Sequence, residues 1–303
     1  MLVSVLLSTR NRAARLAQTL ESFSAIRLPG VQWELVVADN GSSDHTGQVL
    51  EAWSNRLPLC PVHAPEPGLS RGRNAAIAAA RGELLVFTDD DVTVSSEWLA
   101  AYVGAFRSHG AGFFYGGPID SEFEAPLPKS PWTGLAPASV RGLNWGSEER
   151  SLLSTEYFIG PNWACAAGPV RQAGGFDPRM GLGAADGPPG GEEIDLMNRL
   201  SSAGLRSWYL PAARLRHWVP REKVLDQHIK ARWEAVATVR AWSGLAWPHA
   251  VRVGRVPVRV HLEYTIARLR LFAAQVGVGD ALHAERKVLW YRGLLTGFRL
   301  PPR

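Results

Sequence analysis

The sequence predicts an α/β protein with a mostly parallel sheet flanked by helices, followed by a helical extension. Short apolar runs alternate with helical periods through the first hundred residues, and this order is typical of parallel sheets with helices on both faces. After residue 220 the pattern changes to basic helices without strand signals. The chain has 303 residues, of which 46% are hydrophobic and 20% charged, so it is long and apolar enough to bury a sizeable core.

The first third supplies the strands and helices of the predicted sheet. Its strands are read from short runs rich in Leu and Val, and its helices from helical spacing or from an Ala-rich stretch closed by glycine. A proline-rich segment is expected to be a connection without regular structure. The expected strands are 2–8, 33–38 and 83–88, the expected helices are 12–26, 44–53 and 68–80, and the connection is 58–67.

The remainder is expected to hold loops around a site and then helices. Segment 111–190 is rich in Gly and Pro and predicts loops with short strands, including a strand or loop at 158–167. Further expected elements are a helix at 192–203, a strand at 208–215, and helices at 224–242, 258–276 and 283–295. The predicted domains are therefore a catalytic domain over 1–220 and a basic helical extension over 221–303.

Charge is divided unevenly along the chain. The net charge is +5, but residues 1–210 carry −6 and residues 211–303 carry +11, which is unlike a uniform nucleic-acid binder. Two cysteines, no secretion signal and no apolar run of 18 residues favour a cytoplasmic protein, and the basic end adds peripheral contact at the inner face of the cytoplasmic membrane as an expectation.

Three consecutive carboxylates follow the strand expected at 83–88. In an extended segment Asp89 and Asp91 would point to the same face and could reach one hard cation that also binds substrate phosphates, whereas Asp90 would point away and be structural. The alternative is a solvated acidic turn that caps the next helix. Neutralising donors or a divalent cation are expected here because three adjacent carboxylates repel each other.

Other candidate residues lie at the starts of helices and after a late strand. Glu192 and Glu193 follow the glycine-rich segment 181–191, so they could present a general base beside a mobile lid or could serve as helix caps. Arg73 precedes an Ala-rich helix and could meet a phosphate or base, or be an ordinary surface arginine. His217 could be a metal ligand or a structural histidine.

The ordered set of motifs resembles the inverting family 2 glycosyltransferases, which share the GT-A fold of nucleotide-diphospho-sugar transferases. The resemblance covers roughly residues 2–220. The matching segments are Ser8 to Arg12, Val37 to Thr46, Gly68 to Ala75, Val86 to Asp91, Gly160 to Ala164, Gly174 to Asp177, Gly191 to Leu196 and Pro211 to His217.

This resemblance implies a role for each matching position. Glu193, or Glu192 as the second choice, would be the catalytic base. The nucleotide-sugar would contact Thr9, Arg12, Asp39, Arg73, Asn74, Asp89 and Asp90; the metal would contact Asp91, Asp89 and His217; the acceptor would contact Asn162 and Trp163. The family usually has Glu-Asp where this chain has Glu192-Glu193, so the carboxylate is retained on a side chain longer by one methylene.

The resemblance therefore predicts a metal-dependent glycosyltransferase that uses Mn²⁺ or Mg²⁺. It would move a sugar from a nucleotide-diphospho-sugar, a UDP-sugar by expectation, to a hydroxyl of a glycan or lipid-linked glycan, inverting the anomeric centre by single displacement. A role in polysaccharide biosynthesis at the cell envelope follows. Two alternatives remain: a metal-dependent nucleotidyltransferase of related fold, and a non-catalytic sugar-nucleotide-binding protein.

The basic helices after residue 220 have two interpretations. They could form a partly apolar surface that touches an anionic membrane, where lipid-linked acceptors reside. They could instead pack on the catalytic domain, with exposed arginines serving solubility. No nucleic-acid partner is expected.

Overall fold

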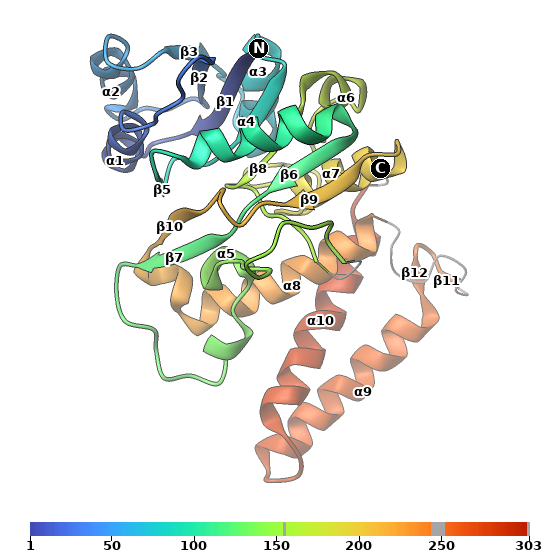
Figure 1. Ribbon diagram of the computed structural model, residues 1–303. Helices are drawn as coiled ribbons and strands as arrows, with labels where there is room; N and C mark the ends of the chain where they lie inside the picture. Colours follow the sequence, from blue (N-terminus) through green and yellow to red (C-terminus); the bar gives the residue numbers. More distant parts are fainter. Residues whose placement is uncertain (154–155, 244–251, 302–303) are drawn as a thin grey trace. The chain divides into compact units, whose positions relative to one another are not determined.

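The computed structural model describes residues 1–153, 156–243 and 252–301, which form two compact units (Figure 1). Unit 1 contains Met1–Glu124, Arg141–Pro178 and Glu192–Val219. Unit 2 contains Ala125–Val140, Arg179–Gly191 and the chain from Pro220 onward. Unit 2 thus takes in two segments from within the range predicted for the catalytic domain.

Unit 1 is an α/β unit built on a mostly parallel sheet, as the sequence predicts. Seven strands run in the order β3-β2-β1-β4-β8-β6-β9, and β8 is antiparallel to both of its neighbours. A smaller sheet has the order β5-β10-β7. The strands are β1 (Leu2–Thr9), β2 (Gln32–Asp39), β3 (Leu59–His63), β4 (Leu84–Phe87), β5 (Val92–Val94), β6 (Phe113–Gly116), β7 (Ile119–Phe123), β8 (Trp163–Ala166), β9 (Arg206–Tyr209) and β10 (Leu215–Val219).

Helices cover both faces of this sheet. One core cluster joins Leu6 and Val36 of the strands to α3, α6 and α7, while α1 and α4 meet through stacked rings of Phe23 and Trp98. In Figure 1 helix α4 crosses in front of the strands. These helices are α1 (Ala13–Phe23), α2 (Thr46–Trp53), α3 (Leu69–Ala79), α4 (Trp98–His109), α6 (Ala167–Gln172) and α7 (Glu192–Ser202).

Three predicted elements differ from the structure. The proline-rich connection 58–67 contains an edge strand, β3, because an edge strand tolerates Pro61, which lacks an N–H. The single strand expected at 208–215 is two strands, because it takes in the end of β9, a turn and the first residue of β10. The acidic triplet leads first into a short strand, β5, and the next helix begins only at Trp98.

The carboxyl edge of the sheet gathers polar side chains from neighbouring strands. Thr9 pairs with Asp39 in the parallel register of β1 and β2, and Asp39 pairs with His63 in that of β2 and β3. Strand β4, on the other side of β1, ends at Phe87, and Thr88 separates it from the acidic triplet. Ligand sites of open α/β sheets lie at this edge, so the fold brings the candidate residues to one place.

Asn162 fastens the segment before β8 to three other parts of unit 1. Its Oδ1 accepts hydrogen bonds from Trp98 Nε1 at 2.9 Å and from the Tyr102 hydroxyl at 2.8 Å. Its Nδ2 donates to the carbonyl oxygens of Pro118 at 2.9 Å and Ala213 at 2.7 Å. The side chain is buried, so these four bonds are made away from water.

Asn162→Ala is expected to lower the free energy of unfolding by about 2–4 kcal/mol, because it leaves several buried polar groups without partners. Chemical denaturation of the two proteins measures the difference. Asn55→Ala is the matched control, since that asparagine lies in an exposed turn and should change the free energy by less than about 0.5 kcal/mol. Equal effects at the two positions would contradict the fastening role.

Unit 2 is built on long helices and a hairpin. Helix α10 packs along α8 where glycines permit close approach: a Cβ on Gly293 would lie 2.2 Å from the carbonyl oxygen of Glu234. The pair is also joined by Arg292, whose guanidinium donates to both carboxylate oxygens of Glu234. The elements are α8 (Asp226–Trp242), β11 (Arg252–Val253), β12 (Val256–Pro257), α9 (Val258–Gln275) and α10 (Ala281–Arg299).

Candidate functional site

An acidic turn between β4 and β5 is held by Arg12. The two terminal nitrogens of its guanidinium donate to Asp90 at 2.7 Å and to Asp91 at 2.9 Å. The Thr9 hydroxyl donates a second bond to Asp90 at 2.6 Å. Burial raises the pKa of Asp90 to about 7, although the charge of Arg12 acts in the opposite direction. Donors from the chain itself therefore stabilise two of the three carboxylates.

The expected alternation of this triplet is wrong. Asp90 and Asp91 occupy a turn, not an extended strand, so the two of them share Arg12 and Asp89 points elsewhere. Asp89 accepts a hydrogen bond from Arg73 at 2.8 Å. Period-two alternation holds only where the backbone is extended, which is why the sequence pattern paired Asp89 with Asp91.

Arg73 joins the acidic turn to the start of α7. Its second terminal nitrogen donates to Glu192 Oε1 at 2.9 Å, so one buried guanidinium binds two carboxylates. Burial alone would lower the pKa of Arg73, but Asp89, Glu192 and Glu193 together raise it. Arg73 is therefore a charged, buried link between α3, the acidic turn and α7.

Two residues that sequence reasoning did not assign complete this link. The Phe176 ring lies under the guanidinium of Arg73 at 5.4 Å and packs edge-on against Phe87. Gly160 leaves room for the guanidinium, since a Cβ there would lie 2.7 Å from a terminal nitrogen of Arg73. The available signal was the glycine that opens the Gly160 to Ala164 segment, which marks a close approach.

The two glutamates at the start of α7 have different environments. Glu192 is buried and paired with Arg73, and its Oε2 has no hydrogen-bond partner among the described residues. Glu193 is half-buried and close enough to raise the pKa of Arg73. Both stand in the first turn, where the helix dipole favours negative charge. Glu192 thus binds Arg73 directly, and the charge of Glu193 also acts on Arg73.

Asp91 and His217 form the candidate metal position. Nε2 of His217 lies 3.3 Å from Oδ1 of Asp91, and both side chains are buried. Carboxylate oxygen and imidazole nitrogen are donors that Mn²⁺ accepts. Within the described residues, no three His, Cys, Asp or Glu side chains gather as a metal cluster. The residues present therefore fit a cation that takes its other ligands from a bound molecule.

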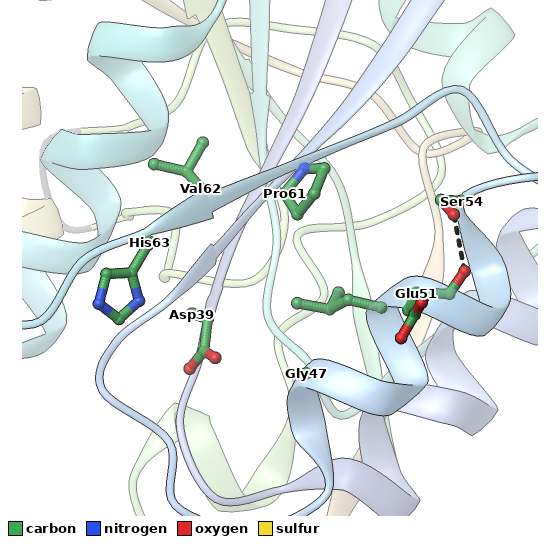
Figure 2. Close-up of a pocket in the computed structure, with 8 residues that line it drawn as sticks. Asp39, Gly47, Glu51, Ser54, Pro61, Val62 and His63 are labelled. Carbon is green, nitrogen blue, oxygen red and sulfur yellow. Dashed lines mark hydrogen bonds between the residues drawn. The ribbon is translucent and has the colours of Figure 1, made fainter.

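A cavity of about 430 Å³ lies beside Asp39. Figure 2 shows Asp39 and His63 on neighbouring strands, with their side chains on the same side. Oδ1 of Asp39 accepts a bond from the Ser42 amide at 2.9 Å, which fixes the carboxylate at the end of β2. The lining residues are Asp39, Gly47, Leu50, Glu51, Ser54, Pro61, Val62 and His63.

Three sequence candidates have other tasks in the structure. Asn74 uses its amide to bind the backbone of Phe176 in both directions, at 2.7 and 2.8 Å. Asn162 makes the four bonds described above, and Trp163 stacks on Phe87 with ring centroids 4.2 Å apart. Asn162 and Trp163 are 1% and 0% exposed, so we leave them out of the proposed acceptor contacts. The buried contacts of Asn162 and Trp163 give these two residues of the Gly160 to Ala164 segment a structural role in packing.

The mostly parallel sheet with its flanking helices is the GT-A fold. Two solved structures carry the same fold. The mannosyltransferase PcManGT from Pyrobaculum calidifontis, in complex with GDP-Man and Mn²⁺, has a TM-score of 0.62 at 18% identity and covers 97% of this chain and 85% of its own. S. aureus TarS in complex with UDP-GlcNAc has a TM-score of 0.58 at 15% identity, with coverages of 98% and 90%.

Residues 4–152 match the model of the family described as Glycosyl transferase family 2. The succinoglycan biosynthesis protein ExoM of Rhizobium meliloti is 26% identical, with 70% of this chain and 65% of that protein covered. The pre-mycofactocin glycosyltransferase of Mycobacterium tuberculosis is 27% identical, with coverages of 82% and 48%. The chain therefore spans less than two thirds of the length of these relatives.

Proposed function

We propose that the protein transfers a sugar from a nucleotide-diphospho-sugar to a hydroxyl of a glycan or lipid-linked glycan, with inversion at the anomeric carbon. The observation that carries this proposal is the arrangement of carboxylates at the carboxyl edge of the sheet. Arg12 and Arg73 hold the acidic turn and Glu192 in place, and Glu193 stands next to them at a helix N-terminus. The family match and the sugar-nucleotide complexes of the structural neighbours support the donor class.

The chain's own groups suit a single displacement. Glu193 would accept the proton of the acceptor hydroxyl as that oxygen attacks the anomeric carbon, which is general-base catalysis. Asp39 at the cavity edge would bind the base, and Thr9 and Arg12 would lie along the nucleotide. No residue is needed as a covalent nucleophile, because inversion follows from one attack on the face opposite the diphosphate. The name of ExoM, a succinoglycan biosynthesis protein, suggests polysaccharide synthesis as the setting.

Asp91 and His217 would hold a divalent cation together with diphosphate oxygens. When bound, the cation would supply positive charge beside the departing diphosphate. Support comes from the two converging donors in this chain and from the Mn²⁺ in the PcManGT complex. Asp89 accepts a hydrogen bond from Arg73 instead, and in this proposal it approaches the ribose of the donor.

Removal of divalent cations with a chelator is expected to lower the rate of sugar transfer at least about 100-fold. In the Asp91→Asn variant, added Mn²⁺ or Mg²⁺ should no longer raise that rate. UDP affinity measured with and without Mn²⁺ reads the metal site directly, independently of turnover. Asp120→Asn is the control, since Asp120 is an exposed carboxylate paired with Arg214. A variant at Asp91 whose UDP affinity still rises with Mn²⁺ would contradict the metal position.

A panel of UDP- and GDP-sugars, each incubated with the protein and analysed by mass spectrometry, tests the proposed function. Slow donor hydrolysis or transfer to an added glycan supports it. Pyrophosphate release from a nucleoside triphosphate and a sugar phosphate would instead identify a nucleotidyltransferase. Failure to bind any nucleotide, together with no hydrolysis or transfer, would leave the non-catalytic alternative.

A further inference from the structure

Helix α9 carries an apolar stripe that the described part of the chain leaves exposed. The stripe residues recur every three, four or seven positions, which places them on one helical face. Their exposed fractions are far above those of core residues. They are Val258 at 43%, Leu262 at 59%, Leu269 at 64% and Phe272 at 67%, followed by Val276 at 68% directly after the end of the helix.

The opposite face of α9 already has its packing partner. Val260 and Ala267 are buried at 0% and 3%, in one cluster with residues of α10. Apolar side chains therefore occur on both faces of this helix, and the face with Val260 and Ala267 is the one that contributes to the core. The exposed stripe is not needed to hold α9 on α10, and contiguous exposed apolar surface of this kind marks an interaction site.

Arginines border the stripe on both sides. Counted around the helix, Arg259 and Arg270 follow one edge and Arg268 follows the other, and all three are exposed. Glu263 is the single acidic residue of α9, and it is half-buried. From residue 252 to 301 the chain has nine Lys and Arg against three Asp and Glu. The surroundings of the stripe are therefore strongly positive.

We propose that α9 lies in the plane of an anionic lipid bilayer, with its stripe in the acyl boundary and its arginines on the headgroups. Positive borders fit lipid phosphates, and long arginine side chains reach the headgroup level while the apolar residues sit deeper. A second copy of the chain would bring the same positive borders against each other. None of the helices that the structure describes is long and apolar enough to cross a membrane, which is consistent with an in-plane position.

This surface is independent of the transfer chemistry and is tested without it. The full chain is mixed with vesicles of phosphatidylcholine alone or with phosphatidylglycerol, and binding is measured by flotation at low and high salt. We expect binding to the anionic vesicles that weakens with salt, and little binding to the neutral ones. Absence of binding to anionic vesicles at low salt would overturn the proposal.

Variants assign the binding to the stripe and its borders. Leu262→Ser, Leu269→Ser and Phe272→Ser combined are expected to weaken vesicle binding at least about tenfold, and Arg268→Gln with Arg270→Gln about fivefold per arginine. Leu153→Ser is the matched control, since Leu153 is also 64% exposed but lies in unit 1, and it should change binding less than about twofold.

Two results would refute the assignment even if the protein binds vesicles or itself. Unchanged flotation of the triple serine variant would place the membrane contact elsewhere. Light scattering that shows a dimer of the wild type and a monomer of the triple variant, with no flotation of either, would identify the stripe as a self-association surface. Because donor hydrolysis is measured separately, failure of this proposal and failure of the proposed function are distinguishable.

Discussion

Glu193→Gln is expected to lower glycosyl transfer by about 10²–10⁴-fold, the range for loss of a general base. The amide keeps the size of the side chain but cannot accept the acceptor's proton. Nucleotide affinity should stay close to that of the wild type, because the hydrogen bonds from Arg73 to Asp89 and Glu192 are left in place, and the free energy of unfolding is measured to show that the variant is folded. Single-turnover transfer, titration with UDP and chemical denaturation measure the three quantities.

The neighbouring glutamate provides the comparison. Glu192→Gln removes a buried charge from Arg73, so we expect lower stability together with a smaller loss of transfer. Glu193→Asp restores the residue usual in the family and should remain within about tenfold of the wild type. If Glu192→Gln abolishes transfer in a protein of native stability while Glu193→Gln is active, Glu192 is the base and our assignment is wrong.

Arg73→Met is expected to lower the free energy of unfolding by about 3–5 kcal/mol, the usual cost of breaking a buried ion pair from one side. Methionine fills part of the space but leaves Asp89 and Glu192 without the guanidinium that joins them. The free energy of unfolding of Arg73→Lys should lie between those of the wild type and Arg73→Met, because an ammonium group does not bind two carboxylates in the planar geometry of a guanidinium. Denaturant titration of the three proteins measures the order of their stabilities.

Arg71 is the control for this series because it lies on the same helix but is exposed and forms its ion pair with Glu66 at the surface. Arg71→Met should change the free energy of unfolding by less than about 1 kcal/mol. A similar loss at both positions would indicate that α3 is sensitive to any lost arginine. The central link that we assign to Arg73 would then be refuted.

The parallel half of the sheet was predictable because its strands are short apolar runs ended by polar clusters. Strand β1 spans Leu2–Thr9 where 2–8 was expected, and β2 spans Gln32–Asp39 where 33–38 was expected. Edge strand β3 was missed because proline usually marks a break in regular structure. In an edge strand, however, Pro61 removes one backbone N–H donor without ending the strand. Strands β9 and β10 were merged because a turn between two apolar strands leaves little trace in periodicity.

The candidate site could be predicted as a set of residues but not as a set of contacts. Motif order brought Thr9, Asp39 and the acidic triplet to one edge of the sheet. Which carboxylate meets which arginine depends on the turn at Asp90, where the backbone is not extended. Asn162 was assigned to the acceptor because it is polar in a glycine-rich motif, but its four buried hydrogen bonds are all within unit 1. Sequence spacing carries no information on such three-dimensional partners.

The ion pairs of Arg12 have a practical consequence for handling the protein. The guanidinium of Arg12 offsets the negative charge of Asp90 and Asp91. The protein itself therefore already reduces the repulsion between these two carboxylates. Preparations stripped of divalent ions should therefore stay folded and can be reloaded with one ion after another. With such metal-free protein, the effects of Mn²⁺, Mg²⁺ and Ca²⁺ on UDP affinity and on transfer can be compared in a single preparation.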